Sequence, residues 1–139
     1  MRIISGLTNL HRMRIDWPRE FDDQLDRLEA DATPRGQRRL ELLTFMLKRL
    51  ADLDAVPMQD TAMIKRVRQS KQHVVWRVSH PYVEGIALRL ICWFPPGADR
   101  VVVTLFSGDK ASMGDVFYDS VGIRADRLID RWVDEAKEA

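Results

Sequence analysis

Three apolar segments in close succession, residues 73–79, 86–94 and 101–107, constrain the fold most. Each is rich in β-branched and aromatic side chains, which favour strands. The breaks between them, residues 80–85 and 95–100, contain proline and glycine and are typical of turns. Because such short connections favour pairing of neighbouring strands, the sequence predicts an antiparallel meander.

Two of these predicted strands carry an arginine in the middle of an apolar run. Side chains alternate across a strand, so Arg77 shares a face with Val75, and Arg89 shares a face with Ile91. A cation in such a position is unfavourable unless it is paired or faces a polar site. The pattern occurs on two adjacent strands and therefore marks Arg77 and Arg89 as candidate site residues.

An amphipathic helix is expected ahead of the strands. Phe21, Leu25 and Leu28 recur at helical spacing behind Pro18, which suits a first helical turn. This helix is expected to end near Asp31.

A second helix is expected to begin at Thr33 and Pro34, a capping residue followed by proline at the first helical position. It is expected to stop before Val56. Its apolar stripe consists of Leu40, Leu43, Leu47 and Leu50. Two helices joined by a short loop form an antiparallel hairpin, and their apolar stripes need a sheet to cover.

The remaining segments complete an α+β fold. Residues 12–17 are compatible with a short leading strand, residues 58–72 are expected to connect the hairpin to the sheet, and residues 1–10 show no clear period. A last helix is expected from the apolar positions Val121, Leu128, Ile129, Trp132 and Val133. The predicted fold class is α+β. A single domain over residues 1–139 has an N-terminal helical hairpin packed on a small antiparallel sheet, followed by a C-terminal helix.

The charges of the chain are unevenly spread, although the formal net charge over 139 residues is only +1. Residues 62–80 contain no acidic side chain. The cations of this segment are Lys65, Arg66, Arg68, Lys71 and Arg77. A local basic zone can bind phosphate groups even when the whole chain is nearly neutral.

Composition also argues against several classes of protein. No apolar run approaches the ~20 residues of a membrane-spanning helix, and the N-terminal residues are too mixed for a signal peptide. The single cysteine, Cys92, excludes an intrachain disulfide and suits a reducing cytoplasm, and we interpret it as a small buried hydrophobe. No group of His, Cys and carboxylate residues has metal-ligand spacing, so neither a metal nor a cofactor is expected.

Five short segments occur in an order that resembles one known superfamily. A basic segment, Ile-Lys-Arg-Val at residues 64–67, precedes a strand with the pattern Val-Trp-Arg-Val at residues 75–78. Then come Leu-Arg-Leu-Ile at residues 88–91, a third apolar strand at residues 101–106, and the loop Gly-Asp-Lys at residues 108–110. These segments follow a predicted helical hairpin. Their order resembles the RelE/ParE superfamily of bacterial toxins, including its HigB-like branch, over most of the chain.

The resemblance implies a toxin of a type II toxin–antitoxin system, an endoribonuclease that cleaves mRNA in the ribosome and is neutralised by an antitoxin protein. In the RelE branch the active site combines cations on the sheet with a tyrosine of the C-terminal segment. By position, Arg77 and Arg89 correspond to the strand cations, Lys110 to the basic loop residue and Tyr118 to the tyrosine. The side chains expected to bind RNA around them are Lys65, Arg66, Arg68, Lys71 and His73.

Such residues can cleave RNA without a metal, because the ribose 2′-OH attacks the adjacent phosphate. The transition state gathers negative charge on the phosphoryl oxygens, and fixed cations in a partly dry groove stabilise that charge. Arginine suits this role since its planar fork matches phosphate oxygens, so Arg77 and Arg89 would position and stabilise the phosphate. Lys110 would neutralise the leaving 5′-oxygen. Tyr118 would take the 2′-OH proton, or would stack on a base without proton transfer.

Structural interpretations of the same residues stay open. Arg77 and Arg89 could pair with Glu84 or Asp115 and so serve only the fold. The basic segment could be a solvated surface, and Tyr118 could be a packed residue.

A non-catalytic binding protein on the same fold is the competing functional hypothesis, because members of the ParE branch act on gyrase by binding. Ser79 stands where a second strand cation is often found. Asp109 and Ala111 stand at loop positions that are basic in the family. A small α+β domain outside the superfamily is the third hypothesis, and parallel central strands or arginines on opposite faces of the sheet would support it.

Overall fold

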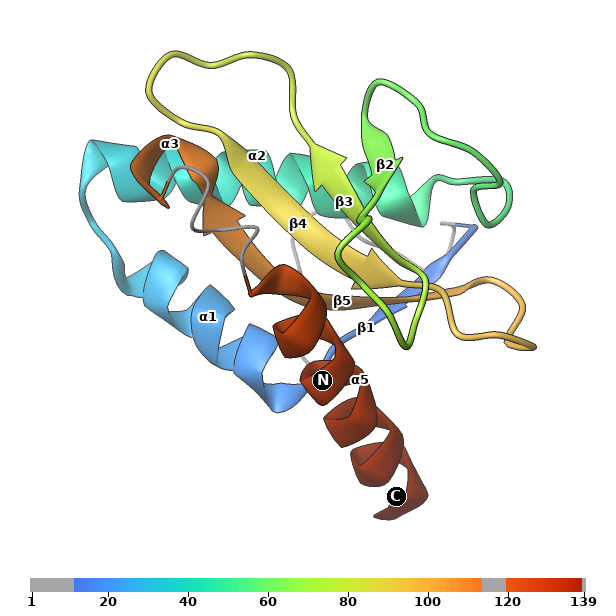
Figure 1. Ribbon diagram of the computed structural model, residues 1–139. Coiled ribbons are helices and arrows are strands. Elements are labelled where there is room, and N and C mark those ends of the chain that lie inside the picture. Colours follow the sequence, from blue (N-terminus) through green and yellow to red (C-terminus); the bar gives the residue numbers. More distant parts are fainter. Residues whose placement is uncertain (1–11, 114–119, 139) are drawn as a thin grey trace.

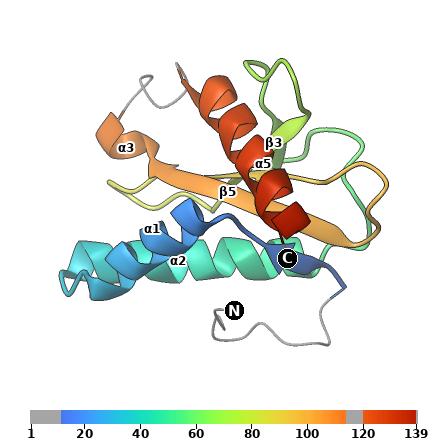
Figure 2. The same ribbon diagram turned by 90° about the horizontal axis from the view of Figure 1, so that it is seen from below.

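A five-stranded sheet separates two layers of helices in this computed structural model, which describes residues 12–113 and 120–138 (Figure 1). Viewed along the sheet, α1 and α2 lie against one face and α5 lies against the other (Figure 2). The described residues form four helices and five strands, so the predicted α+β class is confirmed.

The two helices α1, Arg19–Ala30, and α2, Pro34–Ala51, are present close to their predicted bounds. Thr33 caps α2, because its hydroxyl accepts a hydrogen bond of 3.0 Å from the backbone N–H of Gly36. Proline then occupies the first helical position, where its missing N–H leaves no unsatisfied donor. The apolar stripes of both helices pack on the sheet. Leu43, Leu47 and Leu50 of the predicted α2 stripe are in this core with Leu42 and Met46, whereas the predicted Leu40 is outside it.

The sheet has the strand order β1-β5-β4-β3-β2. The strands are β1 (Arg14–Asp16), β2 (Ile64–Arg66), β3 (Val75–Ser79), β4 (Leu88–Trp93) and β5 (Val101–Asp109). β3, β4 and β5 pair antiparallel, which confirms the meander. β1 instead pairs parallel with β5, so the sheet is mixed rather than wholly antiparallel, and a strand precedes the helical hairpin. A tight turn does not join β1 to β5, so nothing local fixes their relative direction.

Each face of the sheet carries its own core. On the side of α1 and α2, the strands contribute Ile64, Trp76, Val78, Leu88, Leu90, Cys92 and Val102, and Phe94 follows directly after β4. On the side of α5 (Val121–Glu138), they contribute Val75, Ile91, Trp93, Val103, Leu105 and Phe106. The short helix α3, Lys110–Met113, continues directly from the end of β5.

A β-bulge interrupts the pairing of β4 with β5. Ile91 pairs with Phe106, but the next residue, Cys92, pairs with Thr104, so Leu105 is an extra residue in β5. Both Leu105 and Phe106 face the α5-side core. The bulge therefore reverses the alternation of side chains along the rest of β5, because one added residue exchanges the two faces.

The edge strand β2 lies in a segment that was expected to be a connection. It has only three residues, two of them exposed cations, so its sequence carries little strand signal. The preceding loop covers its outer edge, since Arg66 donates its backbone N–H to Asp60 Oδ1 at 2.9 Å and Thr61 donates to the carbonyl of Ile64 at 2.8 Å. These bonds occupy the groups that would otherwise attract another strand.

Cys92 lies fully buried in the α1/α2-side core, which confirms its interpretation as a small hydrophobe. Burial raises the pKa of its thiol far above the ordinary range, because the core disfavours the thiolate. We expect a thiol-specific reagent to leave the native protein unlabelled and to label one thiol per chain in denaturant. Labelling of the native protein at the rate of the unfolded chain would contradict this placement.

Candidate functional site

The two strand arginines lie on the same face of the sheet. Their neighbours two residues along, Val75 and Ile91, both belong to the α5-side core. The register pairs Arg77 with Ile91 and Arg89 with Ser79, so the arginines are diagonal neighbours on β3 and β4. Diagonal Cβ atoms in such a pair are about 7 Å apart. Neither of the two features that would support the third hypothesis is present, since the central strands are antiparallel and the arginines share a face.

Arg77 lines a cavity of about 380 Å³ together with residues from two other parts of the chain. Its cationic side chains are Lys65, Arg66, Arg68, Arg77 and Lys110. The acidic side chain Asp60 also lines the cavity, and it accepts the hydrogen bond from Arg66 N. We call this space the basic cavity. Its cations come from β2 and the following residues, from β3, and from the start of α3, so the fold gathers three of the predicted segments at one place.

The connection between β2 and β3 is fixed against α5. Val67 is buried in the α5-side core, and its N–H donates to the carbonyl of Val75 at 2.9 Å. Gly122, in the first turn of α5, packs so closely on this connection that an added Cβ would lie 2.4 Å from the carbonyl oxygen of Gln69. The first turn of α5 thereby positions the residues that form one wall of the basic cavity.

A Gly122→Ala variant is expected to lose about 1 kcal/mol of unfolding free energy and to bind polyanions more weakly. Alanine favours a helix over glycine by about 1 kcal/mol, so any loss must come from the clash with Gln69, which costs about 1–3 kcal/mol. Thermal unfolding and binding of a labelled single-stranded RNA measure the two effects. The matched control is Ile123→Ala, at a side chain that is 79% exposed. A Gly122→Ala protein as stable as the native one would contradict the close contact.

Asp109 belongs to β5 and turns away from the basic cavity. It is 7% exposed, and its Oδ2 accepts hydrogen bonds from Arg39 Nε at 3.0 Å and Nη2 at 2.8 Å. Its Oδ1 accepts the N–H groups of Ala87 and Ala111 at 2.9 and 3.1 Å. Burial acts to raise the pKa of Asp109, but the Ala87 N–H, the Arg39 guanidinium and the Ala111 N–H together hold it below its ordinary value. The carboxylate is thus neutralised by α2 and does not oppose the cations of the cavity.

The bulge in β5 decides which of two consecutive charged residues faces the cavity. Beyond it, Asp109 pairs with Leu88, which faces α1 and α2. Lys110 follows and lines the basic cavity. If Leu105 continued the regular alternation instead of forming the bulge, Asp109 would face the α5 side.

Arg89 lies on the same face as Arg77 but does not line the basic cavity. Its Nη1 donates to the carbonyl of Leu88 at 3.0 Å. Its Nε is buried and has no hydrogen-bond partner within residues 12–113 and 120–138. Among those same residues it forms no ion pair with Glu84, which was one structural interpretation of this arginine. Asp115, the other suggested partner, lies outside the described residues.

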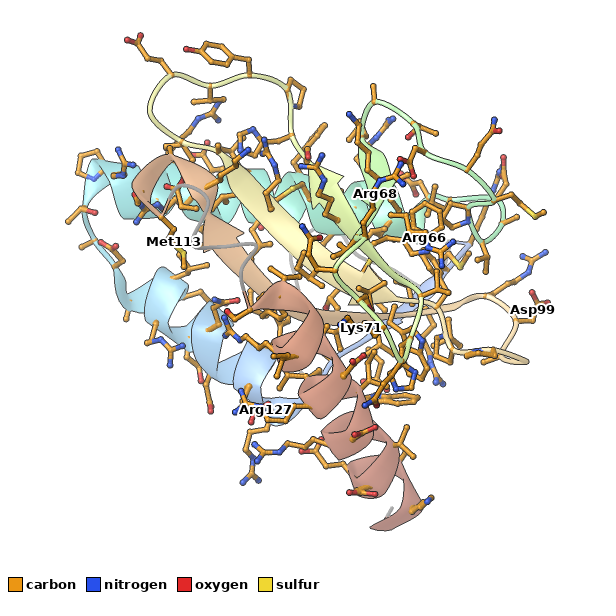
Figure 3. All side chains as sticks on the ribbon, viewed as in Figure 1. Arg66, Arg68, Lys71, Asp99, Met113 and Arg127 are labelled. Carbon is orange, nitrogen blue, oxygen red and sulfur yellow. The ribbon has the colours of Figure 1, made fainter. Side chains whose placement is uncertain are left out.

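Other predicted residues occupy different places. Lys71 lies farther along the connection that carries Arg66 and Arg68, nearer to α5, and does not line the basic cavity (Figure 3). The ring of His73 packs edge-on against Trp93, with 5.4 Å between the ring centroids. His73 Nε2 is also 3.7 Å from the carboxylate of Asp130 on α5.

Tyr118, the predicted proton acceptor, lies outside the described residues. In the part of the chain that the structure does describe, no three His, Cys, Asp or Glu side chains are grouped so that they could hold a metal ion. None of the helices within those residues combines the length and the apolar character that a membrane crossing requires.

Comparisons with protein-family models, with curated proteins and with solved structures found no match. The class of protein is therefore inferred from the fold, the basic cavity and the order of the sequence motifs.

The basic cavity can hold phosphate groups and stabilise charge that develops on them. Arg77 is half-buried, so its charge acts in a medium less polar than bulk water and interacts more strongly with an anion. The exposed Lys65, Arg66 and Arg68 add long-range attraction for a polyanion. Sequence patterns did not indicate Asp60 or Gly122, because an isolated acid in a loop and a glycine early in a helix carry no motif.

Proposed function

We propose that the chain is a RelE/HigB-like toxin, an mRNA endoribonuclease that works without a metal in the cytoplasm. An antitoxin protein would neutralise it by covering the basic cavity. The proposal depends mainly on one observation: Arg77 and Lys110 line the same cavity as the basic residues Lys65, Arg66 and Arg68. The motif order had assigned the first two as catalytic and the others as RNA-binding. The helix pair, the antiparallel meander and the C-terminal helix add support for a RelE-like arrangement, in which β1 is an additional strand at the sheet edge.

In this proposal, Arg77 binds the scissile phosphate and stabilises the charge that gathers on its oxygens. Lys110 neutralises the 5′-oxygen as it leaves, while Lys65 and its neighbours hold the adjoining phosphates. Arg89 adds to the positive potential of the basic cavity from outside it. Its hydrogen bond to the carbonyl of Leu88 holds it on the same face of the sheet as Arg77. Tyr118 remains the proposed acceptor of the 2′-OH proton. The products would be a 2′,3′-cyclic phosphate and a 5′-hydroxyl end.

The test is incubation of the purified protein with mRNA, with and without ribosomes, in the presence of a metal chelator, followed by mapping of new 5′ ends. New 5′-hydroxyl ends that depend on the protein are the expected result, together with arrested growth when the chain is expressed alone in bacteria. Good expression with normal growth and no new RNA ends would overturn the proposal.

A second candidate function is inhibition of a protein target such as gyrase by binding alone. It is favoured by the position of Arg89, because only Arg77 of the two strand arginines lines the basic cavity. Ser79, which pairs with Arg89 in the register, supplies no second cation on β3. Arrested growth without new RNA ends would support this candidate over the first.

A further inference from the structure

The basic cavity adjoins a second cavity of about 480 Å³. The two share the residues Asp60, Arg66, Val67 and Arg68. The second cavity is completed by Met58 and Gln59 of the preceding loop and by Ser70 and Trp76. Since the shared residues form a wall of both, the two cavities lie next to each other at residues 66–68. Figure 3 shows Arg66 and Arg68 on the same side of the molecule, beside β2 and β3.

Each cavity includes one residue of β3, and these two residues lie on different faces of the sheet. Lys65 pairs with Arg77, which shares the α5-side face with Val75. Arg66 pairs with Trp76, which packs in the α1/α2-side core. β2 is an edge strand, so nothing in the sheet continues beyond it. A ligand that fills both spaces must therefore pass around the end of β2 from one face to the other.

We propose that one strand of RNA follows this path and that the substrate of the proposed nuclease is single-stranded over several nucleotides. The inference builds on the proposed function, and it adds a second subsite to the same site. Arg66 and Arg68 bind the phosphates between the two cavities, and a base from a neighbouring nucleotide enters the second cavity. A strand that bends around a sheet edge suits a flexible chain, whereas a rigid duplex cannot follow it. Charged grooves of this kind track the backbone of single strands with little dependence on sequence.

Met58 gives the second cavity a surface suited to a base. Its side chain is 96% exposed and lies in the same cavity as the largely buried Trp76. A thioether is flexible and polarisable, and it makes favourable contacts with aromatic rings. An exposed methionine beside bound phosphates would thus cover the face of one base.

Asp60 stands at the junction and limits the affinity for phosphate. Its Oδ1 accepts the N–H of Arg66, which holds the loop on the end of β2. Asp60→Asn retains an oxygen acceptor at this position but removes the negative charge. This variant is therefore expected to bind RNA about threefold more tightly, since one unfavourable charge beside the phosphates is lost.

The experiment measures binding of labelled 2′-O-methyl RNA, which lacks the attacking hydroxyl and stays intact. An octanucleotide and a dinucleotide are titrated by fluorescence anisotropy with the native chain, with Arg66→Ala/Arg68→Ala, with Asp60→Asn and with Arg77→Ala. The double variant is expected to bind the octanucleotide about tenfold more weakly, and its slope of log affinity against log salt falls by about 1.4, the loss of two single-strand phosphate contacts. Its dinucleotide affinity falls by a smaller factor, because the dinucleotide fills the basic cavity alone, whereas Arg77→Ala weakens both ligands to a similar extent. A duplex of the same sequence binds more weakly than the single strand.

Octanucleotide affinity that is unchanged in the double variant but reduced by Arg77→Ala would overturn the second subsite and leave the nuclease proposal intact. Equal affinity for the duplex would overturn the path around β2. Absence of binding by either oligonucleotide to the native chain, together with absence of mRNA cleavage, would overturn the proposed function itself. The exposed positions of Arg66 and Arg68 make these substitutions compatible with folding, and circular dichroism checks it.

Discussion

Replacement of Asp109 by alanine is expected to lower the free energy of unfolding by about 3 kcal/mol and the melting temperature by about 10 °C. The buried carboxylate connects α2 to the end of β5 through Arg39, and it also accepts the N–H groups of Ala87 and Ala111. Its removal leaves Arg39 without its partner and two backbone donors without an acceptor. Loss of one member of such a pair is costly, because the other charge remains partly buried and uncompensated.

The same carboxylate should make the stability depend on pH in the acid range. The pKa of Asp109 is lower in the folded protein than in the unfolded chain, since the Ala87 N–H and the Arg39 guanidinium outweigh its burial. Its contribution is therefore fully present above the unfolded pKa of about 4 and is lost as the pH falls through the lower folded value. Unfolding by denaturant at a series of pH values should show a smaller acid loss for Asp109→Ala than for the native chain.

A matched control for Asp109 is Asp99→Ala. Figure 3 places Asp99 at the end of β5 opposite to α3, and its side chain is 96% exposed. Substitutions at such surface positions usually change stability by less than about 0.5 kcal/mol. If both variants unfolded at the same denaturant concentration, the Asp109 network would contribute nothing particular to the fold.

The second large effect is expected at Arg77. If the protein cleaves mRNA as proposed, Arg77→Ala should lower the cleavage rate by about 10²–10³-fold, the usual consequence of removing one donor that stabilises a transition-state charge. Arg77→Lys should recover part of the rate, because it restores the charge but not the planar fork. Initial rates of 5′-hydroxyl formation measure the effect, and relief of growth arrest gives an independent measurement.

Arg38→Ala is the control for charge alone. Arg38 lies on α2, where it is exposed and paired with Glu41 at 3.1 Å, and it does not line the basic cavity. Its loss should change the cleavage rate less than about threefold, through long-range attraction only. Similar rates for the Arg77 and Arg38 variants would exclude a direct role of Arg77 in the reaction.

The sequence predicted the elements that have strong local patterns. The α1 and α2 stripes, the capped start at Thr33 and the three strands of the meander each depend on neighbouring residues, and the structure contains them all. β1 and β2 have three residues each, so pairing with a partner strand defines them more than their own composition does. The local pattern also predicted a wholly antiparallel sheet. The parallel pairing of β1 with β5 has no signal in the sequence, because the two strands are far apart in the chain.

The candidate site was predictable only where its residues are adjacent in sequence or alternate regularly. The basic run after β2 and the central position of Arg77 indicated the cavity correctly. The direction of Asp109 was not predictable, because a bulge between two apolar residues, Leu105 and Phe106, leaves the hydrophobic pattern intact. Arg89 was placed on the correct face, but its hydrogen bond to Leu88 depends on rotamers that the sequence does not specify.

The bulge makes the direction of Asp109 depend on how many residues lie between it and the bulge. Deleting Leu105 would remove the bulge and leave Asp109 on its present face, whereas deleting Gly108 with the bulge kept would turn Asp109 to the α5 side and leave Arg39 without its partner. Deletion of one residue between Phe106 and Gly108 should therefore disturb the charges at the basic cavity more than deletion of Leu105 does.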